Sequence, residues 1–259
     1  MQLAHELVGK VSDPALVLVH GITESRHMWH PLVHRLAEHH LVLAVDLRGH
    51  GDSDRCDPYD PISYAQDVVE TVQGLGIEQP LLVGHSLGGV VVSAYAAIAP
   101  CVGVVNVDQP LRLADFQGLL QQLEPMLAGS QEEFEGAISM VFDAMNGPLP
   151  ADEVARISAL RGHPRQDVVL GTWDAVLHST PEELDATVVA LAGAITVPYL
   201  SLHGIDPGPD YAAWLTGLVP SATVEVWTDD GVGLGHYPQL VQPDRFLARL
   251  AEFEAQVRA

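Results

Sequence analysis

The sequence predicts an α/β fold, a doubly wound and mostly parallel sheet with an inserted helical cap. Short apolar runs, typical of strands buried on both faces, alternate along the chain with segments of helical periodicity. The connections between them are short, which favours right-handed crossovers between parallel strands. One long stretch lacks any such run and interrupts the alternation. The 259 residues suffice for one core with an insertion rather than two independent domains.

Six apolar runs are predicted to form the sheet, and helices are expected between them at 28–38, 62–75 and 90–99 and later at 211–218. Ser63 is the expected N-cap of the second of these helices. The predicted strands are 15–19, 41–45, 81–83, 102–107, 197–203 and 223–227, and a helix at 244–257 closes the chain.

Residues 111–192 are predicted to form the cap, so that 1–110 and 193–259 make up the core. Glycine and proline residues break this stretch into helical segments, and no buried strand is expected among them. A helical insertion between two sheet strands would exclude water from a site at the strand ends and shape a pocket there. The expected helices are 114–127, 132–145, 151–160, 166–178 and 181–191.

A Gly-x-Ser-x-Gly motif lies where a predicted strand meets a predicted helix. The strand leads directly into Gly84, His85, Ser86, Leu87 and Gly88. A serine on so sharp a turn stands at the carboxyl end of the sheet, and it needs the two glycines because β-carbons there would collide with the neighbouring strand and helix. Ser86 is therefore the candidate nucleophile. The N–H of Leu87, at the helix start, is a candidate donor to an oxyanion.

Two further segments are predicted to reach the same place. His20 and Gly21 follow the first strand, and the glycine lets the chain turn over the top of the sheet. This turn would leave the N–H of Ile22 facing the space around Ser86, as a second candidate oxyanion donor. His236 lies in a glycine-rich loop after the last strand, and such a loop can bring a histidine over a nucleophile. His236 is therefore the candidate general base.

Taken together, these motifs resemble the α/β-hydrolase family. The resemblance implies Ser86 as the nucleophile and His236 as the base. It also implies the N–H groups of Ile22 and Leu87 as the oxyanion hole. A serine at the turn argues against the haloalkane dehalogenases and epoxide hydrolases of the family, which carry aspartate there. Apart from the cap, the matches span essentially the whole chain: His20-Gly21, Asp46 to Asp54, Gly84 to Gly88, and Gly235-His236-Tyr237-Pro238 with the closing helix.

The carboxylate that would orient His236 has two main candidates. Many family members place this aspartate in a Gly-x-x-Asp arrangement after the fifth predicted strand, but here Asp206 comes one residue too early. Other members, such as fluoroacetate dehalogenases, use the end of the fourth strand, where Asp108 lies. Asp108 is slightly favoured because its spacing needs no adjustment. Asp206 stays open as the alternative, and Asp210 is a distant third.

A serine activated by a histidine predicts hydrolysis through an acyl-enzyme. We expect a small-molecule substrate, a neutral carboxylic ester or a lactone with an apolar acyl or alcohol part, and we expect no cofactor and no metal. Carbon–carbon bond hydrolases, perhydrolases and cofactor-free oxygenases share this machinery and remain alternatives. A small-molecule receptor without turnover is an alternative of another class. The side chains predicted to contact substrate are Trp29, His85, Phe142 and Trp173.

The composition limits the expected partners. With 34 acidic and 12 basic residues the formal net charge is −22, which disfavours nucleic acid and anionic membrane surfaces. Cys56 and Cys101 form no C-x-x-C pair and are expected to be free thiols in a reducing compartment. No basic leader and no long apolar run is present, so a cytoplasmic protein is expected. His27, His30 and His34 are expected to form a solvated helix face rather than a metal site. The oligomeric state stays open.

Overall fold

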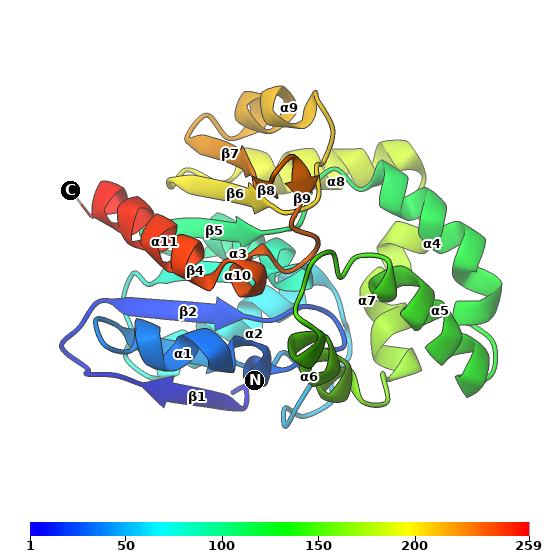
Figure 1. Cartoon of the computed structure of the whole chain (residues 1–259), viewed down its shortest axis with the longest axis horizontal. Coiled ribbons are helices and arrows are strands. Elements are labelled where there is room, and N and C mark those ends of the chain that lie inside the picture. The colour runs from blue at the N-terminus through cyan, green and yellow to red at the C-terminus, as the bar shows by residue number, and fades with distance from the viewer. Residues whose placement is uncertain (259) are drawn as a thin grey trace.

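The computed structural model describes residues 1–258, the side chain of residue 115 excepted. Its strands are β1 (His5–Val8), β2 (Ala15–Val19), β3 (Leu41–Val45), β4 (Leu81–His85), β5 (Gly103–Val107), β6 (Tyr199–His203) and β7 (Ala222–Val226). They form a seven-stranded sheet in the order β1-β3-β2-β4-β5-β6-β7 (Figure 1). β1 pairs antiparallel with β3, and the other pairings in this sheet are parallel. The predicted doubly wound, mostly parallel sheet is confirmed.

The edge strand β1 lies outside the predicted strands. It is mostly half-buried and carries no continuous apolar run, so its sequence lacks the pattern of a central strand. The residues before it tie it to the core, because the N–H of Leu3 donates to the Thr71 hydroxyl at 3.0 Å. A small exposed hairpin also lies outside the predicted strands: β8 (Thr228–Asp229) and β9 (Val232–Gly233).

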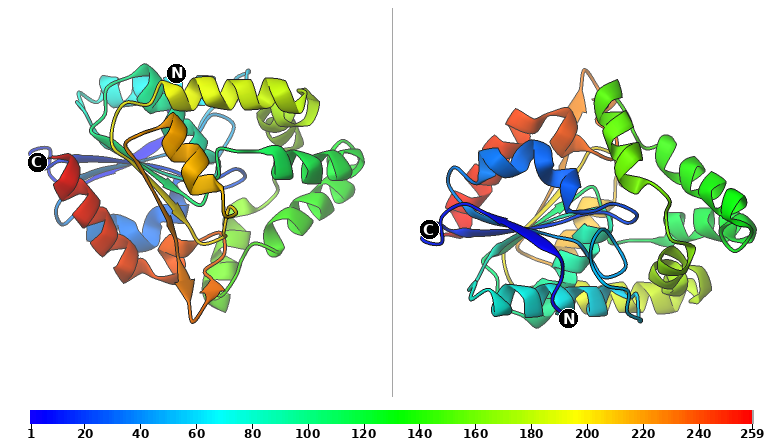
Figure 2. Two further views of the ribbon diagram at one scale, coloured as in Figure 1. Left: turned by 90° about the horizontal axis from the view of Figure 1, so that it is seen from above. Right: turned by 90° about the horizontal axis from the view of Figure 1, so that it is seen from below.

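Two layers of helices cover the sheet: α2 (Pro61–Gly74), α3 (Leu87–Ile98) and α9 (Tyr211–Leu218) lie on one face, and α1 (His30–Leu36) and α11 (Pro243–Val257) on the other (Figure 2). A 3₁₀ turn, η1 (Arg26–Trp29), precedes α1, and a short helix, α10 (Pro238–Val241), precedes α11. Successive strand residues face opposite layers. In β2, Val17 packs with the first layer and Leu18 with the second. Because helices cover both faces of the sheet, the loops at the ends of the strands are the part of the core left to form a site.

Four helices stand beyond the carboxyl ends of the strands as a cap (Figure 1): α4 (Ala114–Leu127), α5 (Gln131–Asp143), α6 (Ala151–Arg161) and α7 (Gln166–His178). Their bounds follow the predicted helices closely. The next helix, α8 (Pro181–Gly193), packs against α3 and α9. Its Val188 and Ala192 belong to the same buried cluster as Tyr95 of α3. The last part of the predicted cap range, 111–192, thus returns the chain to the core layer.

The start of α2 differs from the prediction. Asp60, not Ser63, is the N-cap, since its side chain accepts hydrogen bonds from the N–H groups of Ile62 (2.9 Å) and Ser63 (3.0 Å). Pro61 occupies the first helical position, where an N–H would have no acceptor within the helix, so the missing N–H of proline costs no hydrogen bond. The helix therefore begins one residue earlier than the apolar pattern indicated, and Ser63 lies inside its first turn.

Candidate active site

Ser86 lies on the sharp turn between β4 and α3. Its backbone has φ 53° and ψ −124°, a conformation that side chains rarely adopt. A β-carbon on Gly84 would lie 2.0 Å from the carbonyl oxygen of Gly88, and one on Gly88 would lie 2.3 Å from that of Val19. Both glycines are needed because the helix crosses so close to β4 and β2. The predicted strand, turn and helix around Ser86 are all present.

His236 and Asp108 form a buried hydrogen-bonded pair. The Nδ1 of His236 lies 2.7 Å from Asp108 Oδ2, and Asp108 Oδ1 accepts from the N–H groups of Gly204 (2.7 Å) and Ile205 (3.0 Å). Burial alone would raise the pKa of Asp108, but the hydrogen bond from His236 and the backbone N–H of Ile205 outweigh it and lower that pKa. A charged carboxylate can only accept, so His236 Nδ1 carries the proton and Nε2 presents its lone pair.

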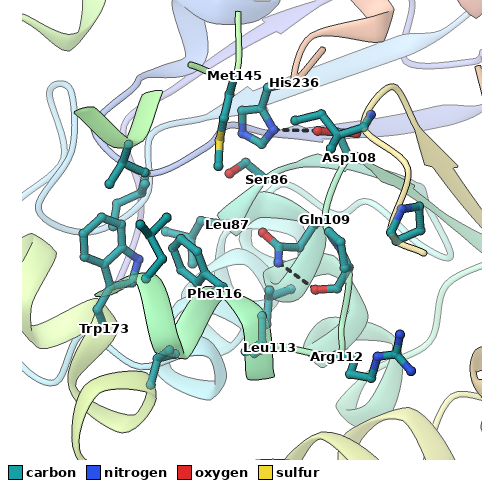
Figure 3. A pocket seen from close by; sticks show the side chains of 18 of the residues that line it. Ser86, Leu87, Asp108, Gln109, Arg112, Leu113, Phe116, Met145, Trp173 and His236 are labelled. Carbon is teal, nitrogen blue, oxygen red and sulfur yellow. Dashed lines mark hydrogen bonds and ion pairs between the residues drawn. The ribbon is translucent and has the colours of Figure 1, made fainter. Parts of the chain in front are cut away.

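The free nitrogen of His236 is directed at the candidate nucleophile. Burial lowers the pKa of His236; the hydrogen bond to Asp108 opposes this, and the nearby His85 reinforces it. His236 Nε2 is buried and has no hydrogen-bond partner among the described residues. In Figure 3 the Ser86 side chain points toward the His236 ring, while the opposite side of the ring meets Asp108. The structure thus brings Ser86, His236 and Asp108 together.

The alternative aspartates lie elsewhere. Asp206 is exposed at the rim of the cavity, and its Oδ1 accepts from the N–H of Gly208 at 2.8 Å. Asp210 is also exposed and directly precedes α9. The short loop after β6 explains this placement. Its first two N–H groups bind Asp108, so the loop turns around Asp108 and carries Asp206 away from the imidazole.

The two candidate oxyanion donors lie beside Ser86. Ile22 and Leu87 both line the cavity, and among the described residues neither N–H donates to a protein acceptor. Leu87 is the first residue of α3, where a helix leaves its N–H groups free. The loop before Ile22 is close to the nucleophile, because a β-carbon on Gly21 would lie 3.1 Å from Ser86 Cβ. An anion at Ser86 would therefore meet two unpaired donors.

A cavity of about 760 Å³ opens between the strand ends and the cap. Ser86 and His236 lie on its core side, and Phe116 and Trp173 are among the cap residues on its wall (Figure 3). Phe142 lines it as well. Phe116 and Trp173 meet edge to face, with their ring centroids 5.7 Å apart. Two of the four side chains predicted to contact substrate, Phe142 and Trp173, therefore lie where a substrate could reach them.

The other two, Trp29 and His85, do not line the cavity, and this part of the prediction is corrected. Trp29 is fully buried with Met28 under the α1 layer. His85 is also fully buried, because the alternation along β4 turns it toward the α1 and α11 face together with Val83. Its Nε2 donates to the carbonyl oxygen of His236 at 2.8 Å. His85 thus supports the candidate base rather than a ligand.

The sequence motifs did not indicate that three further residues would lie near the site. Glu24, Arg161 and Tyr237 join His85 in a buried polar group behind His236. Glu24 stands in a polar loop, and Arg161 ends a cap helix that is far away in sequence. Tyr237 belongs to the motif around His236, but the motif gives no indication of its partners.

Among residues 1–258 no group of three or more His, Cys, Asp or Glu side chains is placed to hold a metal ion. The rings of His27 and His30 meet edge to face, with their centroids 4.6 Å apart. Cys56 is an exposed free thiol and Cys101 a buried one. No helix in the described chain has both the length and the apolar character needed to cross a membrane.

Comparison with known proteins gives consistent matches. The family model described as alpha/beta hydrolase fold matches residues 14–190. A 2-(acetamidomethylene)succinate hydrolase from Mesorhizobium japonicum is 30% identical, over 94% of this chain and 89% of that protein. The structure of an esterase from Rhodococcus has a TM-score of 0.73 and 25% identity, over 98% of this chain and 94% of that one. An enol-lactonase from Burkholderia xenovorans has a TM-score of 0.73 and 21% identity, over 98% and 96% of the two chains.

Proposed function

The chain belongs to the α/β-hydrolase fold family, and on that premise we propose that it is a serine hydrolase that cleaves a neutral carboxylic ester or a lactone. The observation that carries the proposal is the state of His236. Its Nδ1 is held by Asp108 at 2.7 Å, and its unpartnered Nε2 is left for the Ser86 hydroxyl. A serine hydroxyl is a weak nucleophile at neutral pH, so it needs a base in this orientation.

In the proposed mechanism His236 Nε2 removes the proton from Ser86 as the serine oxygen attacks the carbonyl carbon. Asp108 stabilises the imidazolium that forms and stays ionised itself. The N–H groups of Ile22 and Leu87 bind the oxyanion, each contributing on the order of 3 kcal/mol to the transition state. The imidazolium then protonates the leaving alcohol, and an acyl group remains on Ser86. Water, activated by the same imidazole, releases the acid.

The cavity favours a substrate with an apolar part. Its cap wall is built largely from aromatic and aliphatic side chains, including Phe116, Phe142, Met145 and Trp173. Burial of an apolar acyl or alcohol group against them stabilises the complex by about 25 cal/mol per Å². The names of the structural neighbours, an esterase and an enol-lactonase, support the same two bond types.

A second candidate substrate follows from the 30% identical relative, which is named for the hydrolysis of 2-(acetamidomethylene)succinate. That compound carries two carboxylates. Arg112 lines the cavity and is half-buried, and its guanidinium lies 6.0 Å from the ring centre of Trp214. It is therefore the residue that would meet an anionic substrate. Its guanidinium points away from Ser86 in Figure 3, so a neutral substrate remains the first proposal.

The test is turnover of a panel of p-nitrophenyl esters, simple lactones and 2-(acetamidomethylene)succinate by the parent and by Ser86→Ala. The proposal expects turnover of at least one ester or lactone and its loss in the variant. Ser93→Ala is the matched control: Ser93 lies on α3, the helix that begins directly after Ser86. It bonds Tyr199 at 2.8 Å and does not line the cavity, so its variant should keep turnover. Turnover that survives Ser86→Ala would exclude the proposed nucleophile.

A further inference from the structure

Four polar side chains with little solvent exposure lie behind Ser86, His236 and Asp108, and we call them the Glu24 cluster: Glu24, His85, Arg161 and Tyr237. They come from four different segments, the loop after β2, the end of β4, the last residue of cap helix α6 and the loop that carries His236. Glu24 lies at the centre. Its Oε1 accepts from the Tyr237 hydroxyl at 2.6 Å and lies 4.0 Å from Arg161, and its Oε2 lies 3.5 Å from His85 Nδ1.

The cluster holds the two loops that the proposed chemistry depends on. Glu24 Oε2 accepts from the N–H of Gly21 at 3.1 Å, directly before the candidate oxyanion donor Ile22. His85 Nε2 donates to the carbonyl oxygen of His236 at 2.8 Å, and the two rings lie 4.6 Å apart. A shift of Glu24 would therefore reach the oxyanion donor and the base together.

Arg161 connects this cluster to the cap. Its guanidinium donates to the Tyr237 hydroxyl and lies 4.3 Å from the ring centre of Phe142, which lines the cavity. The cap also holds the same loop through its backbone, because the N–H of His236 donates to the carbonyl oxygen of Met145 at 2.7 Å. The position of His236 thus depends on contacts from both the core and the cap.

The charge of Glu24 explains why the arginine is needed. The Glu24 side chain is only 2% exposed. Burial alone would raise its pKa, but the nearby His85 imidazole, the charge of Arg161 and the hydrogen bond from the Tyr237 hydroxyl hold that pKa well below its usual value. A buried carboxylate that stays charged must remain paired. One of its partners comes from the cap, so Glu24 is fully compensated only while α6 is docked.

We propose that Glu24 and Arg161 are positioning residues, which align the oxyanion loop and His236 for reaction when the cap is docked on the core. The inference rests on the proposed serine hydrolase function and adds a role for the cap beyond forming a wall of the cavity. Neither side chain is required to touch the substrate. Both act through Tyr237, His85 and the backbone of Gly21.

The cap helix α6 also offers a matched control. Arg156 lies on the same helix and fastens it to the core, donating to the carbonyl oxygens of His27 (3.0 Å) and Met28 (3.3 Å). It forms an ion pair with Glu153 and does not line the cavity. Arg156→Met removes a cap-to-core contact of similar kind without disturbing the Glu24 cluster.

The experiment compares the rate of Ser86 labelling by a fluorophosphonate in the parent, Glu24→Gln, Arg161→Met, the double variant and Arg156→Met, with folding checked by thermal melting. We expect Glu24→Gln and Arg161→Met each to lower the labelling rate on the order of 10- to 100-fold, because misplaced catalytic groups react slowly. The double variant should lose little more than either single variant, since both act through one network. Arg156→Met should label like the parent.

Equal labelling rates in Arg161→Met and Arg156→Met would overturn the proposal, and so would losses that simply multiply in the double variant. A parent that is never labelled would instead count against the proposed function. In that case NMR titration of the His236 imidazole still tests the cluster, because it needs no substrate and no reaction. A His236 titration that is the same in the parent and in Glu24→Gln would then overturn the proposal.

The sign of the titration shift follows from the groups that face His236. They are Asp108 directly after β5, His85 from β4 and Glu24 from the loop after β2, while Arg161 approaches from the cap through Tyr237. The negative charge of Glu24 raises the pKa of His236. Glu24→Gln should therefore move the titration of His236 to lower pH. A role confined to packing would leave the titration unchanged.

Discussion

The substitution Asp108→Asn keeps one hydrogen-bonding role of this buried side chain, toward the backbone, and changes the other, toward His236. One oxygen accepts from the N–H groups of Gly204 and Ile205, and the other accepts from His236 Nδ1 at 2.7 Å. An asparagine keeps its oxygen toward the two backbone groups, because they can only donate, and turns its NH₂ toward His236. Nδ1 must then accept, so the proton of the neutral imidazole moves to Nε2, the nitrogen that serves Ser86.

An imidazole in this tautomer cannot remove the serine proton. In a Ser-His-Asp enzyme the corresponding change lowers kcat by about 10⁴-fold, equivalent to about 5.4 kcal/mol of activation free energy. We expect a similar loss of kcat for ester hydrolysis, measured by release of p-nitrophenol. KM and the melting temperature should change little, because the new side chain has the same shape and keeps both backbone hydrogen bonds.

Asp206→Asn is the matched control for this measurement. Asp206 is exposed at the rim, and its bond to Gly208 closes only a local turn. This variant should keep kcat within about twofold of the parent, since changes at exposed positions have small effects. The reasoning would be refuted if Asp108→Asn retained kcat within about tenfold of the parent, or if Asp206→Asn lost as much as Asp108→Asn.

Three other predictions follow from the site. Gly88→Ala should lower the free energy of unfolding, measured in urea, by about 1–3 kcal/mol or more, because its β-carbon would lie 2.3 Å from the carbonyl oxygen of Val19. Gly217→Ala is the control: it lies in an open helical position and should raise the free energy of unfolding by about 0.5–1 kcal/mol. The kcat/KM of the parent should fall as the pH drops through the pKa of His236, with a midpoint below the ordinary 6.5, because burial lowers that pKa; a midpoint above 6.5 in the pH profile would contradict this. Trp173→Ala should raise KM for a naphthyl ester by roughly 5- to 100-fold, because about 1–3 kcal/mol of apolar contact is lost. KM for an acetate ester should stay nearly unchanged. Equal KM changes for both esters would place the Trp173 ring outside the substrate site.

The central strands and the sharp turn at Ser86 could be predicted because local sequence determines them. Strands such as Leu41–Val45 are buried on both faces, so nearly every residue is apolar and the pattern is clear. The turn at Ser86 needs glycine on both sides for steric reasons that act within a few residues. The edge strand β1 lacks this local pattern, because its place in the sheet depends on pairing with a distant strand.

The finer details of the site depend on contacts between distant segments. Asp108 rather than Asp206 meets His236 because two backbone N–H groups after β6 turn toward Asp108, and sequence spacing does not show this. His85 was expected in the pocket, but the alternation of β4 turns it into the opposite layer. The Glu24 cluster could not be found from motifs, since Arg161 reaches it from the cap across 137 positions of the chain.

The central claim is that one serine reacts because one imidazole activates it. Its most direct test is the intact mass of the protein after treatment with a fluorophosphonate, followed by peptide mapping. The account predicts one adduct per chain on the peptide that contains Ser86, and none there in Ser86→Ala or, on the same timescale, in His236→Ala. A folded parent that gains no adduct, or gains it on another residue while Ser86 stays unmodified, would contradict it.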